Sequence, residues 1–234
     1  MSTRSPRSGF VRSSARRLPS CRAPSRRPWR PKTVETPRLL LVTERHRTGG
    51  RPLLGVVEEA LRANLPAVQF RDRDLPEEEA WEYAAALREA TRRRGALLFV
   101  NGRPELARAV RADGLHLPEG YPRPPTTEWS GVLTVAAHDG HGLERARQVH
   151  ADFALLSPLF DTRSHPDTEP LGPKRFAALA AESPVPLVAL GGINAGNAHL
   201  ARESGARGVA CMDAILGAPD IAGAVSDLLA AFGD

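Results

Sequence analysis

The chain has few cysteines, few aromatic side chains and no long apolar run. It holds 2 cysteines among 234 residues, Cys21 and Cys211, which supports neither a disulfide scaffold nor a cysteine-rich zinc site. No run reaches the ~18 uninterrupted apolar residues of a membrane helix. With 41% hydrophobic residues, the length suits one domain with an ordinary core. We therefore expect a cytoplasmic protein that does not associate with membranes.

Acidic residues are almost missing from the start of the chain. Residues 1–36 contain ten of the 32 Lys and Arg residues but one of the 27 acids, Glu35, so the net charge of +5 comes from this segment. The mildly acidic remainder has no electrostatic footprint for nucleic acid. Since the segment is rich in Arg, Ser and Pro, we expect a disordered tail over 1–36. A targeting segment, a nucleic-acid-binding arm and an extension from a misassigned start all remain open.

From residue 37 onward, short apolar runs alternate with helical patterns. Continuous apolar runs are typical of strands that are covered on both faces. Strands are expected at 39–43, 67–71, 96–100, 113–117, 132–136, 153–157, 186–190 and 207–211. Helices are expected at 53–64, 76–94, 104–111, 142–150, 173–182, 195–204 and 220–232, with a weak or missing helix at 121–130. This alternation predicts a (β/α)₈ TIM barrel as a single domain over 37–234, with an open doubly wound sheet as the alternative.

Glycines follow the seventh expected strand, in the stretch VALGGINAGN. In a (β/α)₈ barrel, the loops after the strands carry the chemistry, and the loops after strands seven and eight commonly bind phosphate. Gly191 and Gly192 would let a phosphate approach backbone N–H groups, and Asn194 would cap the next helix. The alternative is that the two glycines only form a tight turn.

Other polar residues also lie at expected strand ends. Gln69 and Arg71 share one face of the second strand, and the planar fork of Arg71 suits a phosphate or carboxylate. We interpret Asp72, Arg73 and Asp74 as an exposed salt-bridged run.

Two histidines, His116 and His138, close the fourth and fifth expected strands. Imidazole can exchange protons near neutral pH, although a structural hydrogen bond is the common role of a lone histidine. His141 and His150 fall on a helix and are expected to be solvated. The polar loop 157–172 has the length of a lid or of irregular surface.

Several motifs together resemble one known superfamily. VTER, VQFRDR, LLFVNGR, ADGLHL, SPLFDTRSHP, LGP, VALGGI and GVACMDAI occur in the order found in the thiamine phosphate synthase and thiazole tautomerase (TenI) superfamily, over about residues 38–232. The resemblance implies a (β/α)₈ barrel that binds a small-molecule substrate, thiazole phosphate. It assigns phosphate binding to Gly191, Gly192, Met212 and Asp213. It assigns substrate contacts to Gln69, Arg71, Asn101, Thr162 and Ser164. We expect His116, from its place at a strand end, and His165, in the polar loop, to contact the substrate as well.

The chain departs from the synthase pattern at its metal ligands. The synthase places an aspartate where Gly102 stands and another where this chain reads PEGY. Glu119 is an available substitute, but no second carboxylate is evident, and Mg²⁺ prefers hard oxygen ligands. Two lysines of the synthase pattern are replaced by Arg73 and His165. The tautomerase branch also lacks the aspartates, has a proline at the position of Pro118, and uses a histidine at the position of His138.

These departures favour a tautomerase that needs no cofactor or metal, in which His138 is the catalytic acid and base on thiazole carboxylate phosphate. One alternative is thiamine phosphate synthase, which couples hydroxymethylpyrimidine pyrophosphate to thiazole phosphate with Mg²⁺. Another is a non-enzymatic ligand-binding or regulatory barrel. The sequence leaves a homo-oligomer open.

Overall fold

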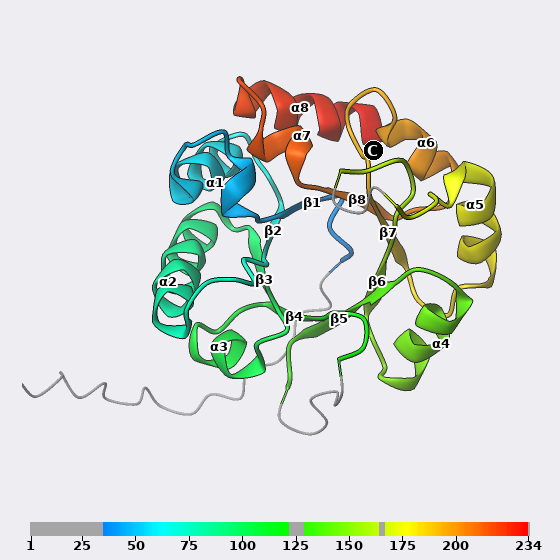
Figure 1. Cartoon of the computed structure of the whole chain (residues 1–234), viewed down its shortest axis with the longest axis horizontal. Helices are drawn as coiled ribbons and strands as arrows, with labels where there is room; N and C mark the ends of the chain where they lie inside the picture. Colours follow the sequence, from blue (N-terminus) through cyan, green and yellow to red (C-terminus); the bar gives the residue numbers. More distant parts are fainter. Residues whose placement is uncertain (1–34, 122–128, 164–166, 234) are drawn as a thin grey trace, which may run out of the picture.

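The chain folds into a closed barrel of eight parallel strands, which a computed structural model describes for residues 35–121, 129–163 and 167–233. The strands follow in the order β1 to β8, and β1 closes the sheet against β8 with Leu40 opposite Ala210. Helices surround the sheet as an outer ring (Figure 1). The (β/α)₈ prediction is therefore confirmed, and the open-sheet alternative is wrong.

The strands have nearly the predicted bounds. They are β1 Leu39–Val42, β2 Ala67–Phe70, β3 Leu97–Asn101, β4 Gly114–Leu117, β5 Val132–Ala137, β6 Phe153–Leu156, β7 Leu187–Leu190 and β8 Gly208–Cys211. The helices are α1 Leu53–Arg62, α2 Glu77–Arg94, α3 Pro104–Ala109, α4 Gly140–Gln148, α5 Gly172–Glu182, α6 Ala198–Glu203, α7 Asp213–Leu216 and α8 Ile221–Phe232, with a 3-10 turn, η1, at Arg45–Arg47.

The apolar strands separate two cores because successive side chains point to opposite faces of the sheet. In β1, Leu39 and Leu41 belong to the cluster between sheet and helices, whereas Leu40 and Val42 belong to the cluster inside the barrel. All four are buried, which explains why the strand reads as a continuous apolar run.

Aromatic packing fills the barrel interior. The rings of Phe99 and Phe153 meet edge to face, with centroids 5.7 Å apart and an interplanar angle of 72°. Gly114 of β4 makes room for this pair, because a Cβ atom there would overlap the Phe99 ring. The interior below the site is therefore a packed layer and not a channel.

Helix α2 begins and ends at the residues that the sequence indicated. Proline at position 76 precedes α2, whose first turn carries Glu77, Glu78 and Glu79. The helix ends at Gly95 with a φ of 67°, which suits glycine. No helix among the described residues is long and apolar enough to cross a membrane.

Some helix predictions differ from the structure. The helix predicted at 195–204 begins at Ala198, because the Asn194 side chain accepts a hydrogen bond from the Gly196 N–H and forms a turn instead of a cap. The short helix α7 was not predicted, and His150 follows α4 with a φ of 53° instead of lying in it. Most of the weak helix at 121–130 and nearly all of the predicted tail lie outside the described residues.

Replacing Gly114 with alanine should destabilise the barrel by about 1–3 kcal/mol, since the new methyl group must displace the Phe99 ring. Urea unfolding would measure this loss. Gly55→Ala is the matched control, because Gly55 lies in α1 with open space around its Cβ position and should gain ~0.5–1 kcal/mol. Equal stability of the Gly114→Ala variant and the wild type would contradict the packing described for the interior.

Candidate active site

A cavity of about 910 Å³ opens at the carboxyl ends of the strands. Every predicted site residue within the described part of the chain lines it, whereas Ser164 and His165 lie outside the described residues. The predicted residues brought together are Gln69, Arg71, Asn101, His116, His138, Thr162, Gly191, Gly192, Met212 and Asp213. The residues that we selected because they end predicted strands therefore lie together in this cavity.

The glycine loop after β7 adopts a backbone that other residues avoid. Gly191 and Gly192 have φ angles of 99° and 67°. The loop after β6 packs directly on them: the Phe160 N–H donates to the Gly191 carbonyl at 3.0 Å, and a Cβ on Gly191 would lie 2.7 Å from Pro158. Within the described residues, the N–H groups of Gly192 and Ile193 have no hydrogen-bond acceptor. Adjacent free N–H groups are suited to an anion.

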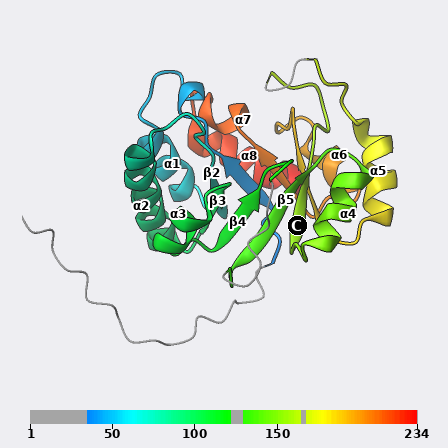
Figure 2. The same cartoon turned by 60° about the horizontal axis from the view of Figure 1, so that its bottom comes forward.

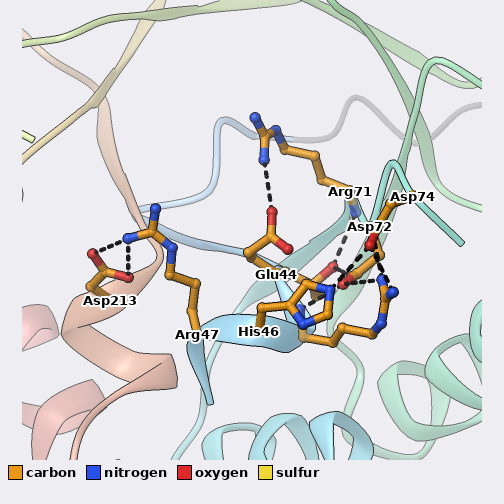
Figure 3. A network of polar contacts seen from close by, with 9 residues as sticks. Glu44, His46, Arg47, Arg71, Asp72, Asp74 and Asp213 are labelled. Atoms are coloured by element: carbon orange, nitrogen blue, oxygen red, sulfur yellow. Dashed lines mark hydrogen bonds and ion pairs between the residues drawn. The ribbon is translucent and has the colours of Figure 1, made fainter. Parts of the chain in front are cut away.

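The loop after β8 borders the same region of the cavity. The carboxylate of Asp213 is held by Arg47, with N–O distances of 2.9 and 3.2 Å, and points toward η1 (Figure 3). The N–H of Ala214 has no acceptor among the described residues. Phosphate binding by this loop would therefore use backbone N–H groups and not the Asp213 side chain.

A second group of donors lies at the carboxyl end of β2. Gln69 is 2% exposed, and its Nε2 has no hydrogen-bond partner within the described residues. Arg71 is half-buried and lies 3.5 Å from Glu44 (Figure 3). Its pKa is lowered by burial and, next, by the nearby Arg73 cation. The buried Gln69 amide has no partner and the half-buried Arg71 has only a long ion pair, so both favour an anionic or polar ligand.

The residues after Arg71 are not one exposed run, as the sequence suggested. Asp72 is buried, and accepts hydrogen bonds from the Thr43 hydroxyl and the Arg45 N–H, both at 2.6 Å. Asp74 is exposed and pairs with the Arg45 guanidinium. Thr43 also accepts from the Arg71 N–H at 3.0 Å, so Asp72 fixes the start of the loop that carries Arg71. The burial of Asp72 could not be predicted from the sequence, because the residues around it are also charged.

His116 is buried beside the hydroxyl of Thr134, with its Nδ1 2.9 Å from that oxygen. Burial, followed by the positive charges of Arg71, Arg73 and Arg145, lowers its pKa to about 3. The expectation of proton exchange near neutral pH is therefore wrong for His116. A neutral imidazole can still form hydrogen bonds with a substrate.

His138 has a different environment. Its Nδ1 lies 2.6 Å from the Ser157 carbonyl oxygen, which can only accept a hydrogen bond, so Nδ1 carries the proton. Its Nε2 lies 3.2 Å from a carboxylate oxygen of Glu119, and both residues line the cavity. The Nε2 atom is the ring position that can gain or lose a proton there.

Comparison with known proteins identifies the family of the chain. A family profile described as thiamine monophosphate synthase matches residues 39–215. The putative thiamine-phosphate synthase of Geobacter sulfurreducens is 41% identical over 187 residues, which cover 78% of this chain and 88% of that protein. The chain belongs to the thiamine phosphate synthase superfamily. It is therefore an enzyme of that superfamily.

Two further proteins of this superfamily are similar along most of their length. The thiamine-phosphate synthase of Moorella thermoacetica is 37% identical over 185 residues, with 77% of this chain and 88% of that protein covered. The solved thiamine phosphate pyrophosphorylase of Pyrococcus furiosus superposes with a TM-score of 0.76 at 28% identity, covering 83% of this chain and 95% of that chain.

The magnesium site that this superfamily implies does not fit the cavity. Among the described residues, the one cluster of three potential ligands is Glu44, His46 and Asp74, and none of them lines the cavity. Asp74 is also already paired with the Arg45 guanidinium. The carboxylates that do line the cavity are Asp72, Glu119, Asp161 and Asp213.

Three of these four carboxylates already have partners. Asp72 is held by Thr43 and Arg45, Asp213 by Arg47, and Glu119 faces His138. Cys211 is no substitute ligand, because burial raises the pKa of its thiol to about 12. The donor set therefore resembles an anion site more than a magnesium site.

The pKa of His116 predicts a pH dependence of stability. Folded His116 resists protonation down to about pH 3, whereas the unfolded imidazole titrates near 6.5. The unfolded chain binds more protons between these values, so the free energy of unfolding should fall as pH decreases from about 6.5. In His116→Asn, this fall should be shallower by up to about 1.4 kcal/mol per pH unit. Urea unfolding at several pH values would measure both slopes, and equal slopes would contradict a neutral His116.

Proposed function

We propose that the chain is a thiamine phosphate synthase, which joins hydroxymethylpyrimidine pyrophosphate to thiazole phosphate and releases pyrophosphate. The observation that carries this proposal is that one cavity holds two separate groups of donors, the free backbone N–H groups after β7 and β8 and the arginines after β2 and β3. The names of the relatives from Geobacter and Moorella support it. The tautomerase that the sequence alone favoured becomes the second candidate.

The first region is the seat for thiazole phosphate. It consists of the loops after β7 and β8, where the N–H groups of Gly192, Ile193 and Ala214 lack acceptors within the described residues. Neutral N–H donors bind a phosphate without requiring a counter-charge in the wall. Met212 and Asp213 contribute through their place in this loop.

The second region is the seat for the pyrimidine pyrophosphate. Arg71 and Arg73 follow β2 and Arg103 follows β3, the strand that lies across the closed barrel from β7. The buried amide of Gln69 would donate to the substrate from the same wall. One cavity of this volume holds two small ligands, whereas proton relocation on one small substrate requires a single seat.

The chemistry follows from this placement. The thiazole nitrogen forms a bond to the methylene carbon of the pyrimidine, and the bond from that carbon to the pyrophosphate oxygen breaks. Negative charge grows on the leaving pyrophosphate, and the arginines would stabilise it. No side-chain nucleophile is needed. Asn101, His116 and Thr162 line the space between the two regions and would position the rings.

The second candidate rests on His138. A carbonyl fixes its Nδ1 proton, and Nε2 faces the cavity beside Glu119, which is the arrangement of a general acid and base. A tautomerase acting on thiazole carboxylate phosphate would use that nitrogen to move one proton.

The direct test is to incubate the purified protein with hydroxymethylpyrimidine pyrophosphate and thiazole phosphate. Chromatography should detect thiamine phosphate and pyrophosphate in equal amounts, well above a sample without enzyme. Isomerisation of thiazole carboxylate phosphate without any coupling would instead establish the tautomerase. Binding of thiazole phosphate with neither reaction would establish a ligand-binding barrel.

His138→Asn separates the two enzyme candidates. In a synthase, the substitution should reduce coupling by less than about tenfold, because no proton transfer by this residue is required. In a tautomerase, it should reduce turnover by about 10²–10⁴-fold, the usual contribution of a general acid or base. Thiazole phosphate affinity, measured by calorimetry, should stay unchanged and serves as the control for folding.

A further inference from the structure

We propose that this cavity binds the diphosphate group of its substrate without a divalent cation, and that Arg71, Arg73, Arg103 and Arg163 take the place of the metal. This inference rests on the proposed function for the identity of the substrate. The binding of a diphosphate itself can be tested independently.

The carboxylates of the cavity are not arranged for a cation. Asp72 is buried, and the Thr43 hydroxyl and the Arg45 N–H occupy its two oxygens. Asp213 is turned toward Arg47 (Figure 3). Both acids therefore already have partners within the protein. With Glu119 facing His138, Asp161 is the one cavity carboxylate left without a partner among the described residues, and a single carboxylate is a poor ligand set for Mg²⁺.

The positive charges of the cavity arginines, by contrast, have few acidic partners. Arg73 and Arg163 line the cavity and form no ion pair with any described residue. Arg71 has one ion-pair partner among the described residues, Glu44, at the long distance of 3.5 Å, and the nearby charge of Asp72 offsets its own charge only in part. An anion between these cations would relieve their mutual repulsion.

The pKa values of two residues, Arg71 and His116, are lowered by this positive charge. After burial, the Arg73 cation is the next cause that lowers the pKa of Arg71. Arg71, Arg73 and Arg145 together add to the effect of burial on His116. Arg71 follows β2 and His116 lies in β4, so the field extends across this side of the cavity.

Gly102 offers a second position on this wall of the cavity at which the diphosphate can be tested. It lines the cavity between Asn101 and Arg103, with a φ of 65°. A Cβ atom there would lie 3.6 Å from the Pro118 side chain, an ordinary contact. Asp and Asn tolerate this left-handed backbone better than most residues. A carboxylate added at this point meets no steric clash, and an asparagine at the same position carries the same backbone strain without the charge.

The experiment measures inorganic pyrophosphate binding by calorimetry, once with EDTA and once with Mg²⁺. We expect binding in EDTA that is at least as tight as in Mg²⁺, because Mg²⁺ competes for pyrophosphate in solution. Arg73→Ala should weaken the EDTA binding by at least about tenfold. Arg92→Ala, which removes an exposed arginine of α2 away from the cavity, should leave it unchanged.

A second pair of variants tests the position of the diphosphate. Gly102→Asp should weaken pyrophosphate binding in EDTA by at least about tenfold, and Mg²⁺ should restore it. Gly102→Asn has the same shape without the charge and should bind pyrophosphate like the wild type under both conditions. An unchanged affinity of Gly102→Asp in EDTA would overturn the placement of the diphosphate on this wall.

Binding that occurs only with Mg²⁺, or no pyrophosphate binding at all, would overturn the inference. The coupling assay separates this failure from that of the proposed function. Coupling together with Mg²⁺-dependent pyrophosphate binding would leave the synthase standing and overturn the inference. Metal-free pyrophosphate binding without coupling would support the inference and overturn the synthase.

Discussion

Closure of the sheet between β1 and β8 is the constraint on which the site depends. The pairing of Leu40 with Ala210 brings the first and last strands together, so that all eight strand ends surround one space. Figure 2 shows the strands side by side with the helices outside them. The packed rings of Phe99 and Phe153 fill the interior below. Chemistry is thus confined to the side chains and loops above this layer.

The charge of the cavity depends on which of its carboxylates already accept hydrogen bonds from other residues of the protein. Asp72 and Asp213 hold loops in place by accepting hydrogen bonds from Arg45 and Arg47. Their use as structural anchors leaves the cavity cations exposed to a ligand. A site built this way attracts anions first, and the chemistry of a diphosphate leaving group suits it.

Much of this structure could be predicted from the sequence. Continuous apolar strands alternating with helical patterns specify the barrel, since this pattern leaves few other ways to bury both faces of each strand. Strand-end position also places Gln69, Arg71, His138 and the glycine loop in one cavity. These predictions depend on local periodicity and on the rule that parallel strands end at the same edge.

The remaining features of the site depend on contacts between residues that are far apart in the sequence. The burial of Asp72 depends on Thr43, which lies 29 residues earlier in the chain. His116 and His138 look alike as strand-end histidines, yet one is buried near arginines and the other faces a carboxylate. The glycine loop also serves packing, because the β6 loop lies directly against Gly191. No pattern within one strand carries this information.

The central claim is that one cavity holds two anionic ligands at once. Calorimetric titration of thiazole phosphate into protein already saturated with inorganic pyrophosphate tests this claim most directly. We expect one thiazole phosphate still to bind, with an affinity close to that measured without pyrophosphate. Competition between the two ligands would mean a single anion seat and would contradict the account.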